Sequence, residues 1–443
     1  MSGENAYRQP VTLKNVLMFS VPTIVMTVFM SFYTMVDGLF VSNLIGTDAL
    51  SAVNLTAPVI SLVTAISTML ATGGSAVIMR KAGQQKAQEA NEDFTFLIAV
   101  NVAVGLIMSG LGYLIMDRLF ERMSLSPAVA GYCRIYLSRY LIFTVPILLM
   151  NNFTLYMIAA GKSALSMVCS ITGGILNIVL DYVFISILDM GIAGAAIATG
   201  LGYSVTAVAG LVIFSKKDCL LHFVKPVYRF SVLKKTVTNG CSEMATALVT
   251  GITTLIFNWT MLKYVGENGV AAITIIMYVL MFATSLYTGY SYGVAPMISF
   301  YYGEQNQDKL KKLIRLSMKI IGFIGAAALM VSLAVTEPLV AIFARPDNPV
   351  YDLAVTGNRI CSSALVFIGF NVFASGMFTA LSNGLVSAVL AFSRSFVFMV
   401  AAMLILPAIL GVTGAWLATP AAEAAAFLLS AVMFIKYRKK YQY

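Results

Sequence analysis

Twelve long apolar stretches follow one another along the chain and take up most of its 443 residues. A helix needs about 20 apolar residues to cross the roughly 30 Å of hydrocarbon in a bilayer. Only 11% of the residues are charged, whereas soluble domains carry about 25%. We therefore predict an all-α integral membrane protein that has the lipid bilayer as a partner and no large soluble domain.

The expected membrane spans are joined by mostly short loops. They are residues 14–42, 49–79, 94–116, 132–158, 163–187, 191–214, 233–262, 269–299, 312–335, 353–380, 384–407 and 412–435. Lysine and arginine gather in every second connection, including the loop 215–232 and the tail 436–440. Because cytoplasmic loops carry an excess of these residues, both termini are expected in the cytoplasm. The net charge of +10 then needs no nucleic acid as a partner.

The sequence lacks the patterns of enzymes and metalloproteins. Its five cysteines are scattered and odd in number, and His222 is the only histidine, so no metal-ligand spacing is present. There is no glycine-rich loop for a nucleotide and no catalytic triad. We expect no enzyme activity and no cofactor, and no metal other than a coupling ion such as Na+.

The chain repeats itself at an offset of 220 residues. Gly46 then falls on Gly266, and Gln85 falls on Gln305. Each half holds six spans and starts on the same side, so the halves are expected to be related by an axis along the membrane normal. The predicted domains are an N-lobe at 1–214, a cytoplasmic connecting loop at 215–232, and a C-lobe with the basic tail at 233–443.

Ionisable side chains inside membrane helices cost about 2.5–3.5 kcal/mol on insertion scales, so each is a candidate functional group. In the N-lobe, Asn177 and Asp181 are four residues apart and share one helix face. Asp37 and Thr199 can reach a similar depth, given the rise of about 1.5 Å per residue. These four oxygen-bearing side chains are expected to form one layer that binds a proton or Na+. The alternative is that the two aspartates only hold helices together by hydrogen bonds.

Further polar residues extend this picture. Tyr136, Asn151 and Asn152 of the fourth span are candidates for the same pathway. In the C-lobe, Arg394 is expected to pair with Glu243 or Glu423, because pairing lowers the desolvation cost of both partners. A structural ion pair and a role in transport both remain open for these three residues. Prolines inside the spans are expected to interrupt the helices, at Pro22, Pro58, Pro146, Pro296, Pro407 and Pro420.

These residues together carry a resemblance to a known family. The motifs are Asp37 within 35–41 followed by Gly46, the run 176–182, the run 191–196, Glu243, and Ala422 with Glu423. In this order the chain resembles the multidrug and toxic compound extrusion (MATE) exporters, and within them a MepA-like bacterial group. The resemblance implies a V-shaped pair of six-helix lobes that exchange a drug for a cation. It also implies a cation site at Asp37, Asn177, Asp181 and Thr199, as in prokaryotic members.

The resemblance has one departure. Glu243 matches an acidic C-lobe position proposed for cation binding in another branch of the family. The second acid of that branch, on the tenth span, is missing, and Asn371 is the nearest polar residue there. We therefore assign the coupling site to the N-lobe.

The expected function is a secondary antiporter of a prokaryotic inner or plasma membrane, acting as a monomer. It would export organic, often cationic and amphipathic, drugs or toxins in exchange for H+ or Na+. The main alternative is a lipid-linked saccharide flippase of the same superfamily, which needs a strongly basic cavity, whereas only Arg394 is clearly basic at mid-membrane. A major-facilitator transporter is disfavoured by the loop 80–85, and an ion channel by the lack of a repeated selectivity filter.

Overall fold

The computed structural model describes residues 7–123 and 126–443, and within these ranges the chain is helical, with no β-strand. Eleven helices or helix pairs are long and apolar enough to span a membrane, and one bent pair adds a twelfth span. Large apolar side chains face outward along the bundle, for example Leu114 at 75% and Phe323 at 76% exposure. Such a surface is stable in lipid and not in water.

The N-lobe comprises the helices of the first half. They are α2 (Leu13–Leu44), α3 (Thr47–Gly83), α4 (Ala87–Arg122), α5 (Pro127–Ile142), α6 (Thr144–Ala159), α7 (Ser163–Asp181), the π-helix η1 (Tyr182–Ile187) and α8 (Gly191–Phe214). The helices α5 and α6 form the twelfth span and are bent by 54°. The bend precedes Pro146, whose ring is not compatible with a continuous helix at that turn.

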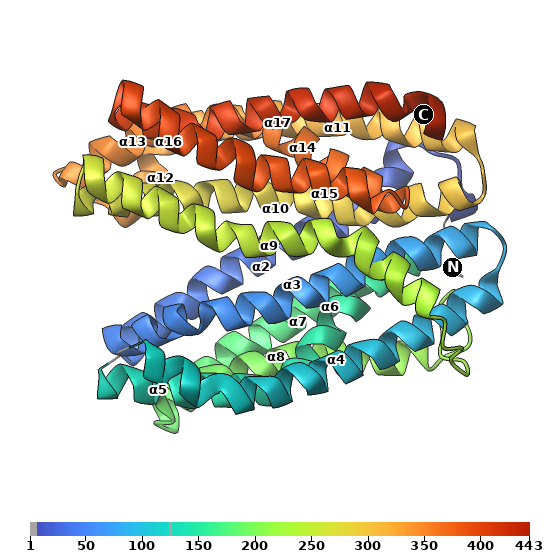
Figure 1. Cartoon of the computed structure of the whole chain (residues 1–443), viewed down its shortest axis with the longest axis horizontal. Coiled ribbons are helices and arrows are strands. Elements are labelled where there is room, and N and C mark those ends of the chain that lie inside the picture. The colour runs from blue at the N-terminus through green and yellow to red at the C-terminus, as the bar shows by residue number, and fades with distance from the viewer. Residues whose placement is uncertain (1–6, 124–125) are drawn as a thin grey trace.

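The C-lobe comprises the helices of the second half. They are α9 (Phe230–Tyr264), α10 (Glu267–Gly303), α11 (Gln307–Ala334), α12 (Thr336–Phe343), α13 (Pro349–Cys361), the 3-10 helix η2 (Ser362–Ala364), α14 (Leu365–Ala380), α15 (Gly384–Phe392), the π-helix η3 (Ser393–Phe398), α16 (Met399–Leu410) and α17 (Val412–Tyr441). Figure 1 shows this lobe lying beside the N-lobe, with both chain ends at one end of the bundle, called here the terminal end.

The expectation that prolines interrupt the spans is correct at Pro146 and wrong at the other five positions. Pro22, Pro58, Pro296, Pro407 and Pro420 lie inside continuous helices. Long membrane helices tolerate proline because neighbouring helices and hydroxyl side chains can satisfy the freed carbonyl groups.

The offset of 220 residues seen in the sequence also appears in the backbone. The helices α3 and α10 begin at Thr47 and Glu267, and they end at Gly83 and Gly303. Gly46 and Gly266 have φ of 127° and 82°, and Gln85 and Gln305 have φ of 62° and 59°. A positive φ is unusual for glutamine, so its recurrence at equivalent turns indicates that both halves have the same construction.

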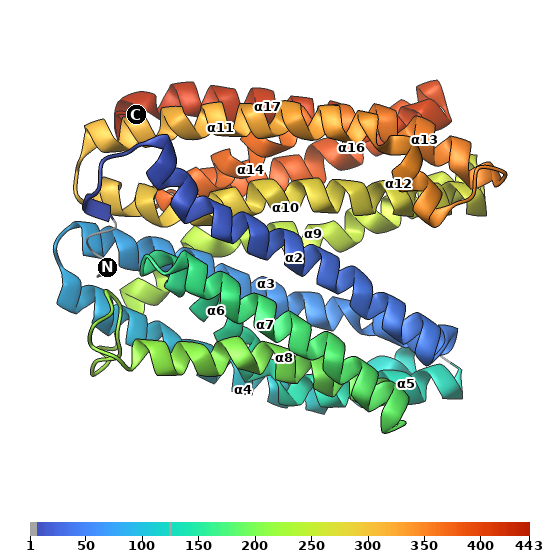
Figure 2. The same ribbon diagram turned by 180° about the vertical axis from the view of Figure 1, so that it is seen from behind.

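The two lobes meet through their first two helices. The helix α2 packs on α10, and α9 packs on α3; Figure 2 shows α2 running obliquely from the C-lobe toward the N-lobe. Thr23 Oγ1 donates to the Gly289 carbonyl at 2.6 Å, and Thr27 Oγ1 donates to the Ser285 carbonyl at 2.8 Å. These bonds hold the lobes together at the level of the candidate pathway.

The connecting loop is fixed to the N-lobe. The His222 amide donates to Asn91 Oδ1 at 2.9 Å, and Arg229 donates to Glu92 and Asp93 at 2.6 and 3.0 Å. Asp93 is fully buried and also pairs with Lys81 at 2.5 Å. A buried carboxylate with two cationic partners is well compensated, so the loop is a folded part of this lobe.

Candidate functional site

Two carboxyl groups from different helices meet inside the N-lobe. Asp37 lies near the C-terminal end of α2, and Asp181 is the last residue of α7, directly before η1. Their carboxyl groups are near neighbours in the interior of the lobe. The wider turn of a π-helix is often found at functional positions, and here it begins one residue after the aspartate.

Asn177 and Thr199 complete the same layer. Asn177 Nδ2 donates to Thr199 Oγ1 at 3.3 Å, and Thr199 Oγ1 donates in turn to the Ala195 carbonyl at 3.0 Å. The two side chains are 1% and 6% exposed. The structure thus brings the four residues selected from the sequence together in two contacting pairs.

This cluster has more acceptors than donors. Asp37 Oδ1, both carboxylate oxygens of Asp181 and Asn177 Oδ1 are buried, and no described residue donates a hydrogen bond to them. Buried polar atoms normally have a partner, and two carboxylates cannot hydrogen-bond without a proton between them. The donor set fits a proton or a hard cation such as Na+, which prefers oxygen ligands.

Three tyrosines surround the two aspartates. Tyr136 from α5 is buried beside both carboxyl groups, as expected for a pathway residue. Tyr33 and Tyr203 line one small cavity near Asp37. The sequence analysis missed Tyr33 and Tyr203, because nothing distinguishes them from the other 19 of the chain's 21 tyrosines before the helices are placed.

The two asparagines of α6 have different surroundings. Asn152 is fully buried and exchanges hydrogen bonds with Asn101 of α4, at 2.7 and 3.2 Å. It therefore faces away from the aspartates and joins two helices. Asn151 lines a cavity of about 180 Å³ between the lobes, together with Met26 and Thr27.

Of its two expected partners, Arg394 pairs with Glu423. Its Nε donates to Glu423 Oε1 and Oε2 at 2.8 and 3.0 Å. Asn371 Nδ2 donates to Glu423 Oε2 at 2.8 Å, and Ser430 Oγ donates to Asn371 Oδ1 at 3.1 Å. Glu423 is 4% exposed, so this is a buried network in which the amide of Asn371 supports an existing ion pair.

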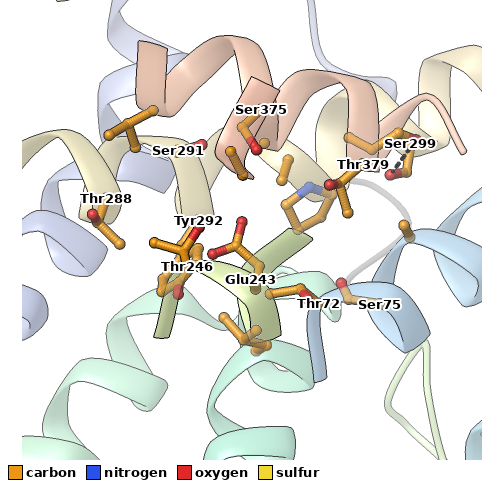
Figure 3. Close-up of a pocket in the computed structure, with 18 of the residues that line it drawn as sticks. Thr72, Ser75, Glu243, Thr246, Thr288, Ser291, Tyr292, Ser299, Ser375 and Thr379 are labelled. Carbon is orange, nitrogen blue, oxygen red and sulfur yellow. Dashed lines mark hydrogen bonds between the residues drawn. The ribbon is translucent and has the colours of Figure 1, made fainter. Parts of the chain in front are cut away.

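Glu243 has a different environment. It lies in a cavity of about 140 Å³ lined by residues of both lobes, and Figure 3 shows its carboxylate among Thr72, Thr246 and Tyr292. Arg394 lines the same cavity, but it forms an ion pair with Glu423 and not with Glu243. The cavity therefore offers one carboxylate without an ion-pair partner among the described residues.

The rest of the cavity wall is rich in hydroxyl groups. Thr288, Ser291, Ser299, Ser375 and Thr379 lie around it in Figure 3. Hydroxyl groups donate and accept in adjustable directions. A carboxylate in such a wall can attract a cation without fixing one geometry for the rest of the molecule.

Known proteins are similar to this chain over most or all of its length. The sequence model described as MatE matches residues 22–183 and 244–404. A relative from Staphylococcus haemolyticus, named multidrug export protein MepA, is 24% identical over 96% of this chain and 93% of its own length. A protein of the same name from Staphylococcus aureus is 22% identical over 99% of this chain and 96% of its own.

Solved structures share the fold. An outward-facing multidrug resistance MATE family transporter of the MOP superfamily has a TM-score of 0.94 at 23% identity, with 100% and 99% of the two chains covered. A MATE structure in complex with MaL6 has a TM-score of 0.95 at 23% identity and the same coverage. These similarities confirm the predicted all-α fold of two six-helix lobes.

Proposed function

Because the chain belongs to the MatE family, we propose that it is a secondary antiporter that exports organic drugs or toxins in exchange for H+ or Na+. The matches to MepA proteins confirm the resemblance found in the sequence, and the chain is a multi-pass membrane transporter, not an enzyme. The curated relatives are named as multidrug exporters. The proposal for this chain adds that transport is antiport, that the coupling ion is H+ or Na+, and which residues bind this ion.

The observation that carries the proposal is the cluster of unpaired oxygens at Asp37, Asn177 and Asp181. A site of this kind binds its cation more strongly when both aspartates are charged, and a bound cation relieves their mutual repulsion. Since the aspartates belong to α2 and α7, ion binding draws these two helices together. Asn177 and Thr199 supply further oxygen ligands from α7 and α8.

The proposed substrate class is organic, often cationic and amphipathic, molecules. Glu243 supplies the negative charge, and the cavities beside it are lined by Met26, Met30 and Tyr292. Flexible methionine side chains adapt to apolar groups of different shape, and an aromatic face attracts organic cations. Figure 3 shows Glu243 and Tyr292 on the same wall.

The proposal places residues 1–214 and 233–443 as the two moving lobes and 215–232 as a connecting loop on the cytoplasmic side. Both termini then face the cytoplasm of a prokaryotic cell, in its inner or plasma membrane. The docking of His222 and Arg229 on α4 supports a connecting loop that moves with the N-lobe. A single chain supplies both the ion cluster and the carboxylate cavity, which supports a functional monomer.

The flippase alternative requires free basic groups in the cavity for a pyrophosphate. Arg394 is engaged by Glu423, and Glu243 adds a negative charge, so no observation favours that reading. The test is drug-dependent cation flux in proteoliposomes, with the proton gradient and the sodium gradient imposed separately. One of the two gradients should drive uptake of a cationic dye. Transport driven by neither gradient would remove the antiport proposal.

A further inference from the structure

The ion cluster of the N-lobe and the carboxylate of the C-lobe are joined by a series of cavities. Three cavities lie in sequence, and neighbours in the series share lining residues. The series begins at Tyr33 and Tyr203, near Asp37, and ends at Glu243. At each link, one of the shared side chains carries a hydroxyl group, Ser170 at the first and Tyr292 at the second.

The first cavity touches the tyrosine pair of the ion cluster. Its volume is about 10 Å³, and its lining includes Tyr33, Tyr203 and Ser170. Tyr33 and Tyr203 face each other across this cavity, and both lie near Asp37. A volume of about 10–15 Å³ holds one water molecule. The cavity can therefore connect one water to the hydroxyl groups that surround the aspartates.

The second cavity continues from Ser170. Its volume is about 180 Å³, and it shares Ser170, Met30 and Met150 with the first. Ser170 Oγ is buried and has no hydrogen-bond partner among the described residues. A buried hydroxyl group at the boundary of two cavities is a natural place for ordered water. Asn151 and Thr154 provide further polar groups along the wall.

The third cavity, which contains Glu243, connects the N-lobe to the C-lobe. Tyr292 belongs to α10, yet it packs against the N-lobe residues Met26, Ala71 and Leu155. It lines both the second cavity and the cavity of Glu243. Figure 3 shows Tyr292 close to Glu243, with Thr246 beside them. Its hydroxyl group is thus the junction between the two lobes.

We propose that this series of cavities holds hydrogen-bonded water and relays a proton between the Asp37–Asp181 pair and Glu243. The proton leaves an aspartic acid for the tyrosine pair, passes through water at Ser170 to Tyr292, and arrives on the Glu243 carboxylate. Each hydroxyl group and each water accepts one proton and gives up another, so the relay leaves them unchanged. One aspartate becomes charged and Glu243 becomes neutral.

The relay explains physically how movement of a proton is coupled to release of the drug. While the proton is on the aspartate pair, Glu243 is charged and holds a cationic drug. When the proton reaches Glu243, its attraction for the drug disappears. The inference rests on the proposed antiport function and takes H+ as the coupling ion. It adds four relay residues, Tyr33, Tyr203, Ser170 and Tyr292, to the coupling site.

The charged and titratable groups around the two ends are few. The aspartate end is faced by Tyr33 of α2, Tyr136 and Tyr140 of α5, and Tyr203 of α8. Glu243 is faced by Tyr292 of α10 and by Arg394 of η3, whose charge is matched by Glu423 of α17.

A pH jump tests the relay directly. Purified transporter in detergent is loaded with ethidium, and release of the dye is followed by stopped-flow fluorescence after the pH is lowered. We expect Ser170→Val and Tyr292→Phe to slow release about 10-fold or more, because each removes a proton-transfer group. Equilibrium dye affinity at the starting pH should be unchanged in Ser170→Val, because Ser170 lies away from the cavity of Glu243. Ser204→Val is the matched control, since Ser204 lies on α8 outside the cavities and donates to the Gly200 carbonyl.

The outcomes separate the relay from the proposed function. Wild-type release rates in both Ser170→Val and Tyr292→Phe would overturn the relay, as would dye release triggered by Na+ and not by pH. Undiminished release in Asp181→Asn would overturn it too, because Glu243 would then take its proton from bulk water. The antiport proposal itself fails only if neither gradient drives transport in proteoliposomes.

Discussion

Arg394 donates its Nε–H to both carboxylate oxygens of Glu423, at 2.8 and 3.0 Å, within the wall of a cavity that also contains Glu243. Glu423 is further held by Asn371. The three charges of the C-lobe core are therefore not equivalent. Two of them neutralise each other, and Glu243 is left as the carboxylate that a transported cation can approach.

Removing Arg394 alone should destabilise the protein. In Arg394→Met, Glu423 would be a buried charge without its partner, which costs about 3–5 kcal/mol. The double variant Arg394→Met with Glu423→Gln should recover most of that loss, because both charges are removed together. Thermal unfolding in detergent measures both effects. Equal unfolding temperatures of the single and double variants would show that the pair is not the source of stability.

Glu243→Gln should weaken drug binding, and it should leave only the part of the coupling that comes from ion binding at the aspartate pair, because it removes the acceptor of the relay. Loss of one charge at a partly hydrated site removes about 1–4 kcal/mol of attraction for a cation, which corresponds to about a fivefold or larger rise in the dissociation constant of ethidium. Glu267→Gln, at the exposed start of α10, is the control. If Glu243→Gln bound ethidium as tightly as the wild type, the cavity would not be the substrate site.

Two equivalent glycines allow the lobes to touch at the terminal end. A Cβ atom on Gly83 would collide with the Phe300 carbonyl, and one on Gly303 would collide with the Arg80 carbonyl. Overpacking of this kind costs about 1–3 kcal/mol, so Gly83→Ala and Gly303→Ala should both open this end and reduce dye efflux. Spin-label distances across the two lobes measure the opening.

The control for these glycines is Gly110→Ala, because a Cβ atom there would meet nothing within 4 Å. It should leave the distances and the efflux unchanged. Since Gly83 and Gly303 are equivalent in the repeat, their effects should also be similar in size. A strong effect of only one of them would mean that the lobes do not contribute equally to closure at this end.

The sequence predicted the general plan because membrane spans have strong signals. Long apolar runs located all twelve spans, and the offset of 220 residues recurs in the positive φ of Gln85 and Gln305. The proline expectation failed at Pro22 because a helix in lipid can continue when neighbours satisfy its backbone. The π-helices η1 and η3 were not predicted, because one extra residue in a turn leaves no periodic signal.

The candidate site was predicted in part for similar reasons. Asp37 and Asp181 stood out because carboxylates in membrane helices are costly, and helix depth brought Asn177 and Thr199 to them. Depth alone did not decide which way Asn152 faces, and it faces Asn101. The choice between Glu243 and Glu423 as partner of Arg394 depended on how α9, α17 and η3 pack, which spacing along one helix does not reveal.

The most direct test of the coupling site compares three variants in proteoliposomes with an imposed gradient. Asp181→Asn and Asp37→Asn are expected to reach the membrane in normal amounts, because asparagine has almost the same shape as aspartate and the site already contains unpaired oxygens. They should bind ethidium but lose gradient-driven efflux, while Glu243→Gln keeps part of it. Full gradient-driven efflux by Asp181→Asn, together with none by Glu243→Gln, would place the ion site in the C-lobe and contradict this account.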